Sequence, residues 1–317
     1  MSVVRKGSLI CLIMGPYTYV YDERVPFLGE GSMGVVYKGY ELGSGKNVAI
    51  KRVKDRFANV PEIRRRAHLE ASLMFSHPNL VEMLGCCETS SQYGPIFIVS
   101  GFIEGDNIDK FIDKELKTLP NVEHRICNMF LSVLDALSYI HQKGIIHMDI
   151  KPSNIMVEKG RNIRLMDLGI ADISDHVTAA GMMGTPKYAA PEQFANSGEK
   201  KKYGPPTDIY EAGVTLYELI TKKNPFVATS IEDAKKLHQT VVLQKTPAIS
   251  LKVLEVLRKA TAIDPQKRYQ SASEMKSALA IALQPPSEKS NSWLYISIAI
   301  LSFLILLSVI LLFIMRS

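Results

Sequence analysis

One stretch in the middle of the chain restricts the possible folds more than any other. Residues 147–154 have the sequence HMDIKPSN, and the turn MDLG follows at residues 166–169 after a short predicted hairpin. A solvated turn is the simpler interpretation, but it leaves the combination of two carboxylates, a lysine and an amide unexplained. We therefore treat both segments as candidates for catalysis.

A glycine-rich stretch nearer the amino terminus is a candidate phosphate site. Residues 29–34 read GEGSMG, and glycines let backbone N–H groups approach phosphate oxygens. The pattern alone is weak evidence, because a flexible hairpin contains the same glycines and a dinucleotide site needs a following helix. Here a predicted strand follows, and the sequence VAIK ends on Lys51, 17 residues after Gly34. That lysine is either a solvated edge charge or a partner of nucleotide phosphates.

Together these motifs resemble the protein kinase superfamily. The glycine loop, the VAIK lysine, the HxDxKPxN loop and the DxG turn occur in the order and spacing of that family. Later matches are GTPKY at residues 184–188, APE at residues 190–192, Asp208 and Arg268. The similarity covers residues 17–283.

The resemblance implies an α+β fold with two lobes. An antiparallel sheet with one helix forms the amino-terminal lobe, about residues 17–105, and a mainly helical lobe follows, about residues 106–283. Residues 1–16 are an extension before this domain. Lys151 and Thr185 look like those of serine/threonine kinases, and the overall style is similar to bacterial Hanks-type kinases.

The resemblance also implies roles for the reactive side chains. Asp149 would accept the proton of the substrate hydroxyl, and Lys151 would place positive charge near the transferred group. Asn154 and Asp167 would bind Mg²⁺, with Mn²⁺ as an alternative, and Lys51 would hold the α- and β-phosphates of ATP. The expected catalytic residues are Asp149, Lys151 and Asn154.

The expected ATP site continues around Lys51. Glu70 would pair with this lysine, although His68 occupies the offset that the family leads us to expect. A carboxylate is what Lys51 needs, so we favour Glu70. The expected nucleotide-binding residues are Leu28, Gly29, Gly31, Gly34, Val36, Ala49, Lys51, Glu70 and Ser100.

Met148 departs from the family pattern. It replaces an arginine that pairs with a phosphorylated residue in the activation segment, and a thioether makes no such charged contact. We therefore expect activity without phosphorylation of that segment. Two other residues have structural roles: Asp208 would accept hydrogen bonds from the catalytic loop, and Arg268 would pair with Glu192 beneath the substrate platform, residues 184–192.

Local patterns agree with this organisation. Residues 121–142 carry apolar side chains at three- and four-residue spacing, which predicts one amphipathic helix. The other predicted elements are strands at residues 35–40, 47–53, 80–88 and 95–101 and helices at residues 61–75, 207–221, 250–263 and 271–283.

The carboxyl-terminal part differs from the rest. Residues 293–315 form 23 consecutive positions without a charge, and a helix of that length spans a bilayer core of about 30 Å. We predict one transmembrane helix there, preceded by a linker at residues 284–292. Because nine extended residues reach only about 30 Å, the globular part would work close to a membrane surface.

Charge and cysteine content exclude other classes. The net charge of +6 arises from 38 Lys and Arg against 32 Asp and Glu, spread in small groups. A nucleic-acid partner requires a denser basic stripe with aromatic residues for stacking, so we expect none. The four cysteines include no CxxC, which indicates neither a zinc site nor a disulfide framework.

These observations predict a membrane-anchored serine/threonine kinase that transfers the γ-phosphate of ATP to protein substrates. We expect its kinase domain in the cytoplasm, at a bacterial cytoplasmic membrane, because ATP and magnesium are available there. The alternative is a membrane-tethered pseudokinase scaffold that binds nucleotide without transfer, an interpretation supported by Met148 and the uncertain pairing of Glu70. A lipid or small-molecule kinase is a third interpretation, which the peptide platform disfavours.

Overall fold

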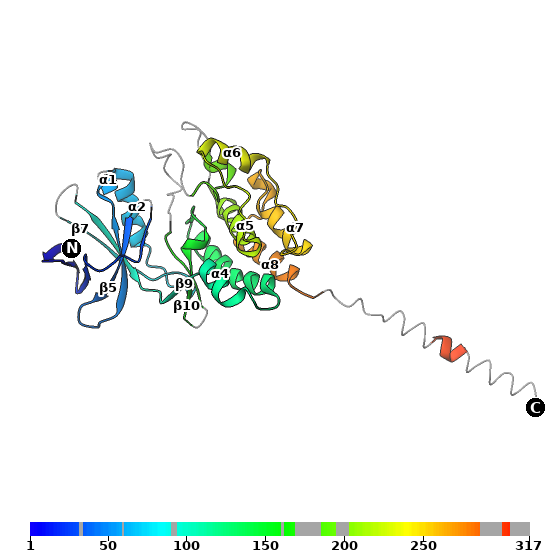
Figure 1. The fold of residues 1–317 in the computed structure, drawn as a ribbon, viewed down its shortest axis with the longest axis horizontal. Coiled ribbons are helices and arrows are strands. Elements are labelled where there is room, and N and C mark those ends of the chain that lie inside the picture. Colours follow the sequence, from blue (N-terminus) through cyan, green and yellow to red (C-terminus); the bar gives the residue numbers. More distant parts are fainter. Residues whose placement is uncertain are drawn as a thin grey trace, which may run out of the picture. The chain divides into compact units, whose positions relative to one another are not determined.

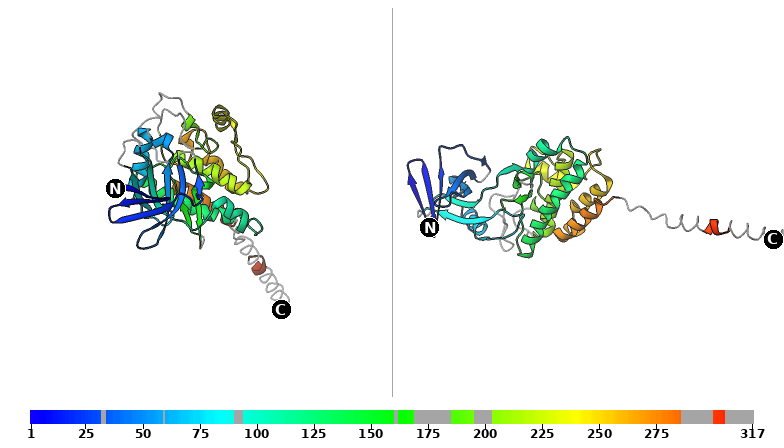
Figure 2. Two further views of the ribbon diagram at one scale, coloured as in Figure 1. Left: turned by 60° about the vertical axis from the view of Figure 1, so that its left-hand side comes forward. Right: turned by 90° about the horizontal axis from the view of Figure 1, so that it is seen from below.

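The structure is a computed structural model that describes residues 1–31, 34–58, 60–89, 94–159, 162–168, 185–194, 203–285 and 300–304. The chain divides into two compact units, Met1–Ala282 and Leu283–Ser317. Within the first unit the strands gather in the amino-terminal part and the helices in the remainder (Figures 1 and 2). The predicted α+β class with a sheet lobe and a helical lobe is confirmed.

The amino-terminal lobe is built on one antiparallel sheet. Its strands have the order β1-β2-β3-β5-β6-β8-β7, and the short β4 pairs with β5. Short turns join most neighbouring strands, as antiparallel pairing allows. The strands are β1 Ser2–Lys6, β2 Leu9–Met14, β3 Tyr17–Asp22, β4 Gly29–Glu30, β5 Gly34–Glu41, β6 Asn47–Val53, β7 Met83–Glu88 and β8 Ile96–Gly101.

This sheet curls until its first strands lie against its last one. Strands β1 and β2 both contact β7, and the thiol of Cys87 on β7 donates to the carbonyl oxygen of Ser2 over 3.4 Å. The curl encloses a hydrophobic core to which β2 and β3 contribute half of the buried side chains. The core residues are Ile10, Leu12, Met14, Tyr19, Tyr21, Val48, Ile50, Cys87, Phe97 and Val99.

The extension at residues 1–16 contains two strands, β1 and β2, that the sequence analysis did not predict. Ile10, Leu12 and Met14 alternate along β2 and are buried, which is the period of a half-buried strand. The turns on either side use Gly7 and Gly15, both with positive φ, at 63° and 60°. Residues 1–16 are therefore part of the sheet.

Two helices cover the other face of the sheet. These are α1, Asp55–Ala58, and α2, Pro61–Ser72. The neighbours Cys86 and Cys87 point to opposite faces, so Cys86 belongs to the core under α2. The predicted helix at residues 61–75 ends early, because Leu73 leaves the helical conformation with ψ of 77°.

The second lobe is mainly helical. Its longest helix, α4, Val122–Gln142, has the predicted bounds to within one residue, and α5 is buried along nearly its whole length. A three-stranded sheet of order β11-β10-β9 lies at its border with the first lobe. The remaining elements are β9 Gly105–Asn107, α3 Ile108–Phe111, a π-helix Ile112–Leu116, β10 Ile155–Glu158, β11 Ile163–Leu165, α5 Pro205–Thr221, α6 Ile231–Thr240, α7 Leu251–Ala260, α8 Ala272–Ala282 and short 3₁₀ helices at Pro152–Asn154, Pro191–Phe194 and Pro265–Lys267.

The second unit is described only at residues 283–285 and 300–304, and residues 300–304 are helical. Most of the predicted linker at residues 284–292 and of the predicted span at residues 293–315 lies outside the described residues. Within the described parts of the chain, no helix combines the length and the apolar character that a bilayer crossing requires.

Candidate active site

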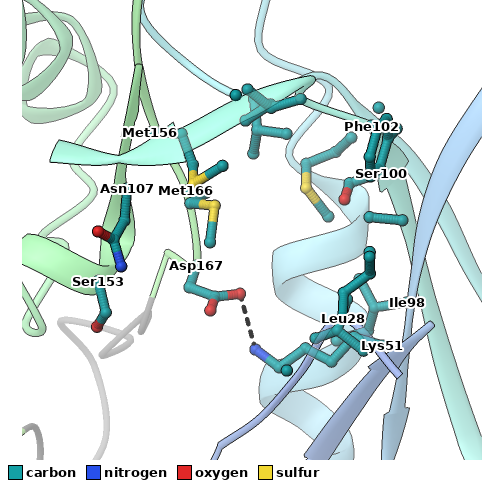
Figure 3. Close-up of a pocket in the computed structure, with 18 of the residues that line it drawn as sticks. Leu28, Lys51, Ile98, Ser100, Phe102, Asn107, Ser153, Met156, Met166 and Asp167 are labelled. Atoms are coloured by element: carbon teal, nitrogen blue, oxygen red, sulfur yellow. Dashed lines mark hydrogen bonds and ion pairs between the residues drawn. The ribbon is translucent and has the colours of Figure 1, made fainter. Parts of the chain in front are cut away.

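A cavity of about 410 Å³ is bordered by strands of the large sheet on one side and by the paired strands β9 and β10 on the other. Figure 3 shows Leu28, Lys51 and Ile98 facing Met156 and Met166 across it. Most of the residues that the sequence predicts for nucleotide and metal binding line this cavity. They are Leu28, Gly29, Val36, Ala49, Lys51, Glu70, Ser100 and Asp167.

Two of the predicted glycines are not among the lining residues. The N–H of Gly31 donates to the carbonyl of Gly34 over 2.9 Å. A Cβ atom on Gly34 would lie 2.8 Å from the carbonyl oxygen of Arg52 on the neighbouring strand. The close approach of β5 and β6 therefore requires glycine at position 34 whether or not a phosphate binds.

An ion pair joins the two sides of the cavity. The ammonium of Lys51, on β6, lies 3.0 Å from a carboxylate oxygen of Asp167 (Figure 3). Burial by itself lowers the pKa of Lys51, but the charges of Asp167 and Glu70 outweigh it and raise this pKa above its usual value. The charge of Lys51 in turn holds the pKa of Asp167 below its usual value. Both groups are therefore ionised at neutral pH.

Glu70 and His68, the two candidates on α2 for pairing with Lys51, lie in different places. Glu70 lines the cavity, and burial raises its pKa to about 7 although the charge of Lys51 opposes this. His68 lies instead beside Cys86, with 3.3 Å between its Nδ1 and the sulfur, and 3.4 Å from Glu88. Of the two residues, the cavity contains Glu70, which acts on Lys51 through its charge.

On the other side, the predicted catalytic residues form a connected cluster. The ammonium of Lys151 lies 2.6 Å from Asp149 Oδ2 and donates to the Thr185 hydroxyl over 2.7 Å. That hydroxyl donates to Asp149 Oδ1 over 2.8 Å. The Asn154 amide donates to the backbone carbonyl of Asp149 over 2.8 Å and to its carboxylate over 3.1 Å. Three side chains thus fix the orientation of the Asp149 carboxylate.

The helix α5 holds the loop that carries this cluster. Asp208, fully buried, accepts hydrogen bonds from the backbone N–H groups of His147 and Met148, each over 2.8 Å, and lies 2.7 Å from His141. These bonds keep Met148 in the left-handed region, with φ of 66°. The predicted structural role of Asp208 is confirmed.

Comparison with known proteins fits this geometry. The model of the protein kinase domain matches residues 23–279. The chain belongs to the protein kinase family. A probable serine/threonine-protein kinase of Streptomyces coelicolor is 32% identical over 266 residues, which are 80% of this chain and 38% of the relative. The serine/threonine-protein kinase PrkC of Bacillus subtilis is 31% identical over 264 residues, which are 80% of this chain and 39% of the relative.

These comparisons confirm the predicted resemblance to bacterial serine/threonine kinases. A further relative, the serine/threonine-protein kinase Pkn1 of Myxococcus xanthus, is 31% identical over 270 residues, which are 81% of this chain and 37% of the relative. The chain spans about two fifths of the length of these curated relatives. The region that the family model matches contains all the residues of the cavity and of the Asp149 cluster.

The chain has oxygen donors suited to a divalent cation at Asp167 and Asn154. The carboxylate of Asp167 is 38% exposed. The amide nitrogen of Asn154 is used by Asp149, which leaves the amide oxygen free to face a metal ion. Carboxylate and amide oxygens are ligands that Mg²⁺ accepts, together with phosphate oxygens and water. Among the described residues no group of three His, Cys, Asp or Glu side chains forms a metal site.

A further ion pair, between a buried arginine and Glu192, holds the segment that follows Thr185. Arg268 is buried, and its guanidinium donates to both carboxylate oxygens of Glu192 over 2.8 Å. The predicted pairing of these residues is confirmed.

Sequence analysis missed part of the cavity lining. Phe102, Asn107, Ser153, Met156 and Met166 all line it. The position of Met156 follows from strand geometry. Ile155 and Val157 beside it are buried, and strand side chains alternate between faces, so Met156 points to the opposite face. Phe102, Asn107 and Met166 lie at strand ends and Ser153 lies in a 3₁₀ helix, and neither setting has a periodicity that places a side chain.

Proposed function

We propose that this protein is a serine/threonine protein kinase that transfers the γ-phosphate of ATP to hydroxyl groups of protein substrates. The observation that carries the proposal is the pairing of two sets of residues. Lys51 and Asp167 meet in the cavity, and Asp149, Lys151 and Thr185 are hydrogen-bonded to one another. Membership of the kinase family and the names of its relatives favour serine or threonine as acceptor.

The residues divide the reaction between them. Asp149 accepts the proton as the O–H bond of the substrate breaks, the hydroxyl oxygen bonds to the γ-phosphorus, and the bond to the β-phosphate oxygen breaks to release ADP. Lys51 holds the α- and β-phosphates, and Lys151 offsets negative charge at the transferred group. A Mg²⁺ ion held by Asp167 and Asn154 would neutralise charge on the phosphates.

A transfer assay tests this proposal. The full chain in detergent is incubated with Mg-ATP labelled at the γ-phosphate and a generic basic protein, beside the variant Asp149→Asn. We expect label on serine or threonine with the parent chain and a loss of about 10³-fold or more in the variant, which lacks the base and keeps the fold. ATP binding by the parent without any transfer would contradict the proposal and favour a scaffold.

The packing around Met148 supports activity without activation-segment phosphorylation. Met148 is buried and packs with Ile146 and the ring of Tyr203. An apolar contact therefore occupies the position where an arginine would bind a phosphate. We expect phosphatase treatment of the parent chain to leave its transfer rate unchanged. Loss of activity that returns on rephosphorylation would contradict this.

A membrane anchor at residues 293–315, with the kinase domain in the cytoplasm, completes the proposal. Its support is the uncharged run of 23 residues, which is long enough to cross a bilayer. Extraction of membranes at alkaline pH tests the anchor, because a peripheral protein is released and a spanning one is not. Release of the intact chain would contradict the membrane anchor.

A further inference from the structure

A second set of polar side chains on α5 contacts the catalytic loop. Asp208, Glu211 and Thr215 lie three and four residues apart, so they share one face of the helix. Each is buried, with at most 1% of its surface exposed. Asp208 holds the loop at residues 147 and 148, as described above. The two other residues act further along the loop, at Ile150.

Glu211 and Thr215 bind both backbone groups of Ile150. The N–H of Ile150 donates to Glu211 Oε2 over 2.7 Å. The hydroxyl of Thr215 donates to the carbonyl oxygen of Ile150 over 2.9 Å. Ile150 is itself fully buried, so no solvent replaces either hydrogen bond if it is lost.

These two contacts fix the peptide planes on either side of Ile150. The N–H belongs to the peptide group that follows Asp149, and the carbonyl belongs to the one that precedes Lys151. Holding both planes sets the direction in which each neighbouring side chain leaves the backbone. The contacts of Asp208 lie one and two residues before Asp149 and do not restrain these planes.

Glu211 also connects the loop to the substrate platform. The side chain of Gln193 accepts the N–H of Ala190 over 2.5 Å through its amide oxygen, so its amide nitrogen is available to Glu211. Glu211 is hydrogen-bonded to the Gln193 side chain. Ala190 belongs to the platform that follows Thr185, and Thr185 contacts Asp149. The carboxyl of Glu211 thus joins the backbone beside the base to the platform.

We propose that Glu211 and Thr215 form a second clamp on the catalytic loop, in which Glu211 is a positioning residue that sets the orientation of Asp149 relative to the substrate platform. This inference rests on the proposed kinase function and deepens it. It assigns to α5 a role in the geometry of transfer in addition to the support that Asp208 gives to the fold.

The charge state of Glu211 indicates which variant keeps the clamp. Burial raises the pKa of Glu211 well above its usual value, and the neighbouring charge of Asp208 adds to this. A neutral carboxyl group and a glutamine amide have the same shape, and both offer an oxygen acceptor to the N–H of Ile150. Leucine has a similar size and offers none.

The first test compares Glu211→Gln and Glu211→Leu in the full chain by steady-state kinetics. We expect Glu211→Leu to lower kcat by about 10- to 100-fold with an unchanged KM for ATP, because a small misplacement of the base affects transfer and not nucleotide binding. Glu211→Gln should lose only about threefold in kcat, because the hydrogen bond to Ile150 survives and only the oxygen that faces the Gln193 amide is replaced by a donor group. A Gln variant as slow as the Leu variant would overturn the assignment.

A control separates positioning from stability. Val214 is buried on the same helix, and Val214→Ala removes packing without removing a hydrogen bond to the loop. If Glu211→Leu loses kcat only in proportion to its loss of folded protein, as Val214→Ala does, the clamp is a purely structural feature and the inference fails.

A milder variant covers the case in which Glu211→Leu does not fold. Thr215→Val removes one hydroxyl and leaves the carbonyl of Ile150 without its bond, so kcat should fall by about fivefold at an unchanged KM for ATP. A parent chain without transfer activity would refute the proposed function. An active parent together with Thr215→Val at the parental kcat would refute the clamp alone.

Discussion

Two ion pairs of the chain are built in different ways, that of Arg268 with Glu192 and that of Lys51 with Asp167 in the cavity. The guanidinium of Arg268 is fully buried and donates five hydrogen bonds, two to Glu192 and three to backbone carbonyls, which uses all five of its N–H donors. The side chain of Lys51 is 20% exposed and donates one described hydrogen bond, to a carboxylate that is 38% exposed.

The difference separates structural support from ligand binding. Every N–H donor of Arg268 is satisfied by the protein, so this pair is complete without a ligand. The charges of Lys51 and Asp167 remain open to the cavity, where phosphate and metal would take over part of their pairing. Loss of the first pair should therefore damage the fold, and loss of the second should damage the reaction.

The largest expected loss of stability follows from Arg268→Leu. The variant leaves the Glu192 carboxylate without its partner and several backbone carbonyls without donors. Breaking a buried pair on one side typically costs about 3–5 kcal/mol. We expect a decrease of this size in the free energy of unfolding, measured by urea denaturation of the full chain in detergent.

The double variant Arg268→Leu with Glu192→Gln serves as its control. Removing the unpaired charge should restore part of the lost stability, because the remaining amide has a lower cost of burial than a carboxylate. A single variant within about 1 kcal/mol of the parent would show that this pair resembles a surface pair.

A second loss of stability is expected in the curled sheet, away from both ion pairs. Leu12→Ala removes a fully buried side chain of β2 from the core that β1, β2 and β7 enclose. Leucine-to-alanine changes in cores cost about 2–5 kcal/mol. The matched control is Leu9→Ala on the same strand, where the side chain is 37% exposed, and we expect less than about 1 kcal/mol there. Equal effects at the two positions would mean that β2 is not part of the cooperative core.

The two ion pairs and the catalytic loop show how much of the site the sequence predicts. The order of the motifs predicted the catalytic loop, Asp167 and the pairing of Arg268 with Glu192, because these side chains are tied to a reaction or to one another. The contact of Asp208 with the loop backbone was predicted because Asp208 belongs to a family motif, whereas contacts of single residues outside any motif with a distant backbone carry no such pattern. Glu211 and Thr215 lie in the predicted helix at residues 207–221, and nothing in the helical pattern indicates that both of them bind Ile150.

The amino-terminal strands were missed for a different physical reason. A run such as residues 9–14 is short and apolar, and its length alone does not separate a strand from a helical or leader segment. Burial of Ile10, Leu12 and Met14 depends on the curl of the whole sheet, which brings β2 against β7. Local sequence contains no information on that closure.

A third prediction concerns the nucleotide side directly. Lys51→Met should abolish phosphate transfer, because the lysine that holds the phosphates is lost, yet lower the free energy of unfolding by less than Arg268→Leu does, because solvent in the cavity reaches the Asp167 carboxylate, which is 38% exposed. Lys46→Met is the control, since Lys46 forms an exposed pair with Glu82 at the same distance of 3.0 Å. An unfolded Lys51→Met variant would remove the contrast with Arg268.

The smallest expected effect is a pH dependence that arises from Glu70. Its pKa of about 7 lies above the usual value of 4.5. Between pH 4.5 and pH 7, Glu70 therefore holds a proton in the folded chain that it has released in the unfolded chain. Stability therefore falls as the pH rises through this window and is lowest, as far as Glu70 contributes, above pH 7. Glu70→Gln removes this contribution.

The Tm of Glu70→Gln and of the parent is measured between pH 5 and pH 8, without nucleotide or divalent metal. We expect the Tm of the variant to rise relative to that of the parent by a few degrees as the pH increases. The size follows because about 1 kcal/mol shifts Tm by about 2–4 °C in a chain of this size. Glu82→Gln should follow the parent at every pH, because that side chain is 61% exposed. Parallel Tm curves for the parent and Glu70→Gln would mean that Glu70 is ionised throughout. The carboxylates of Asp167 and Glu70 would then both be ionised beside Lys51 over the whole range from pH 5 to pH 8. Lys51, like Arg268, would then be held mainly by groups of the protein.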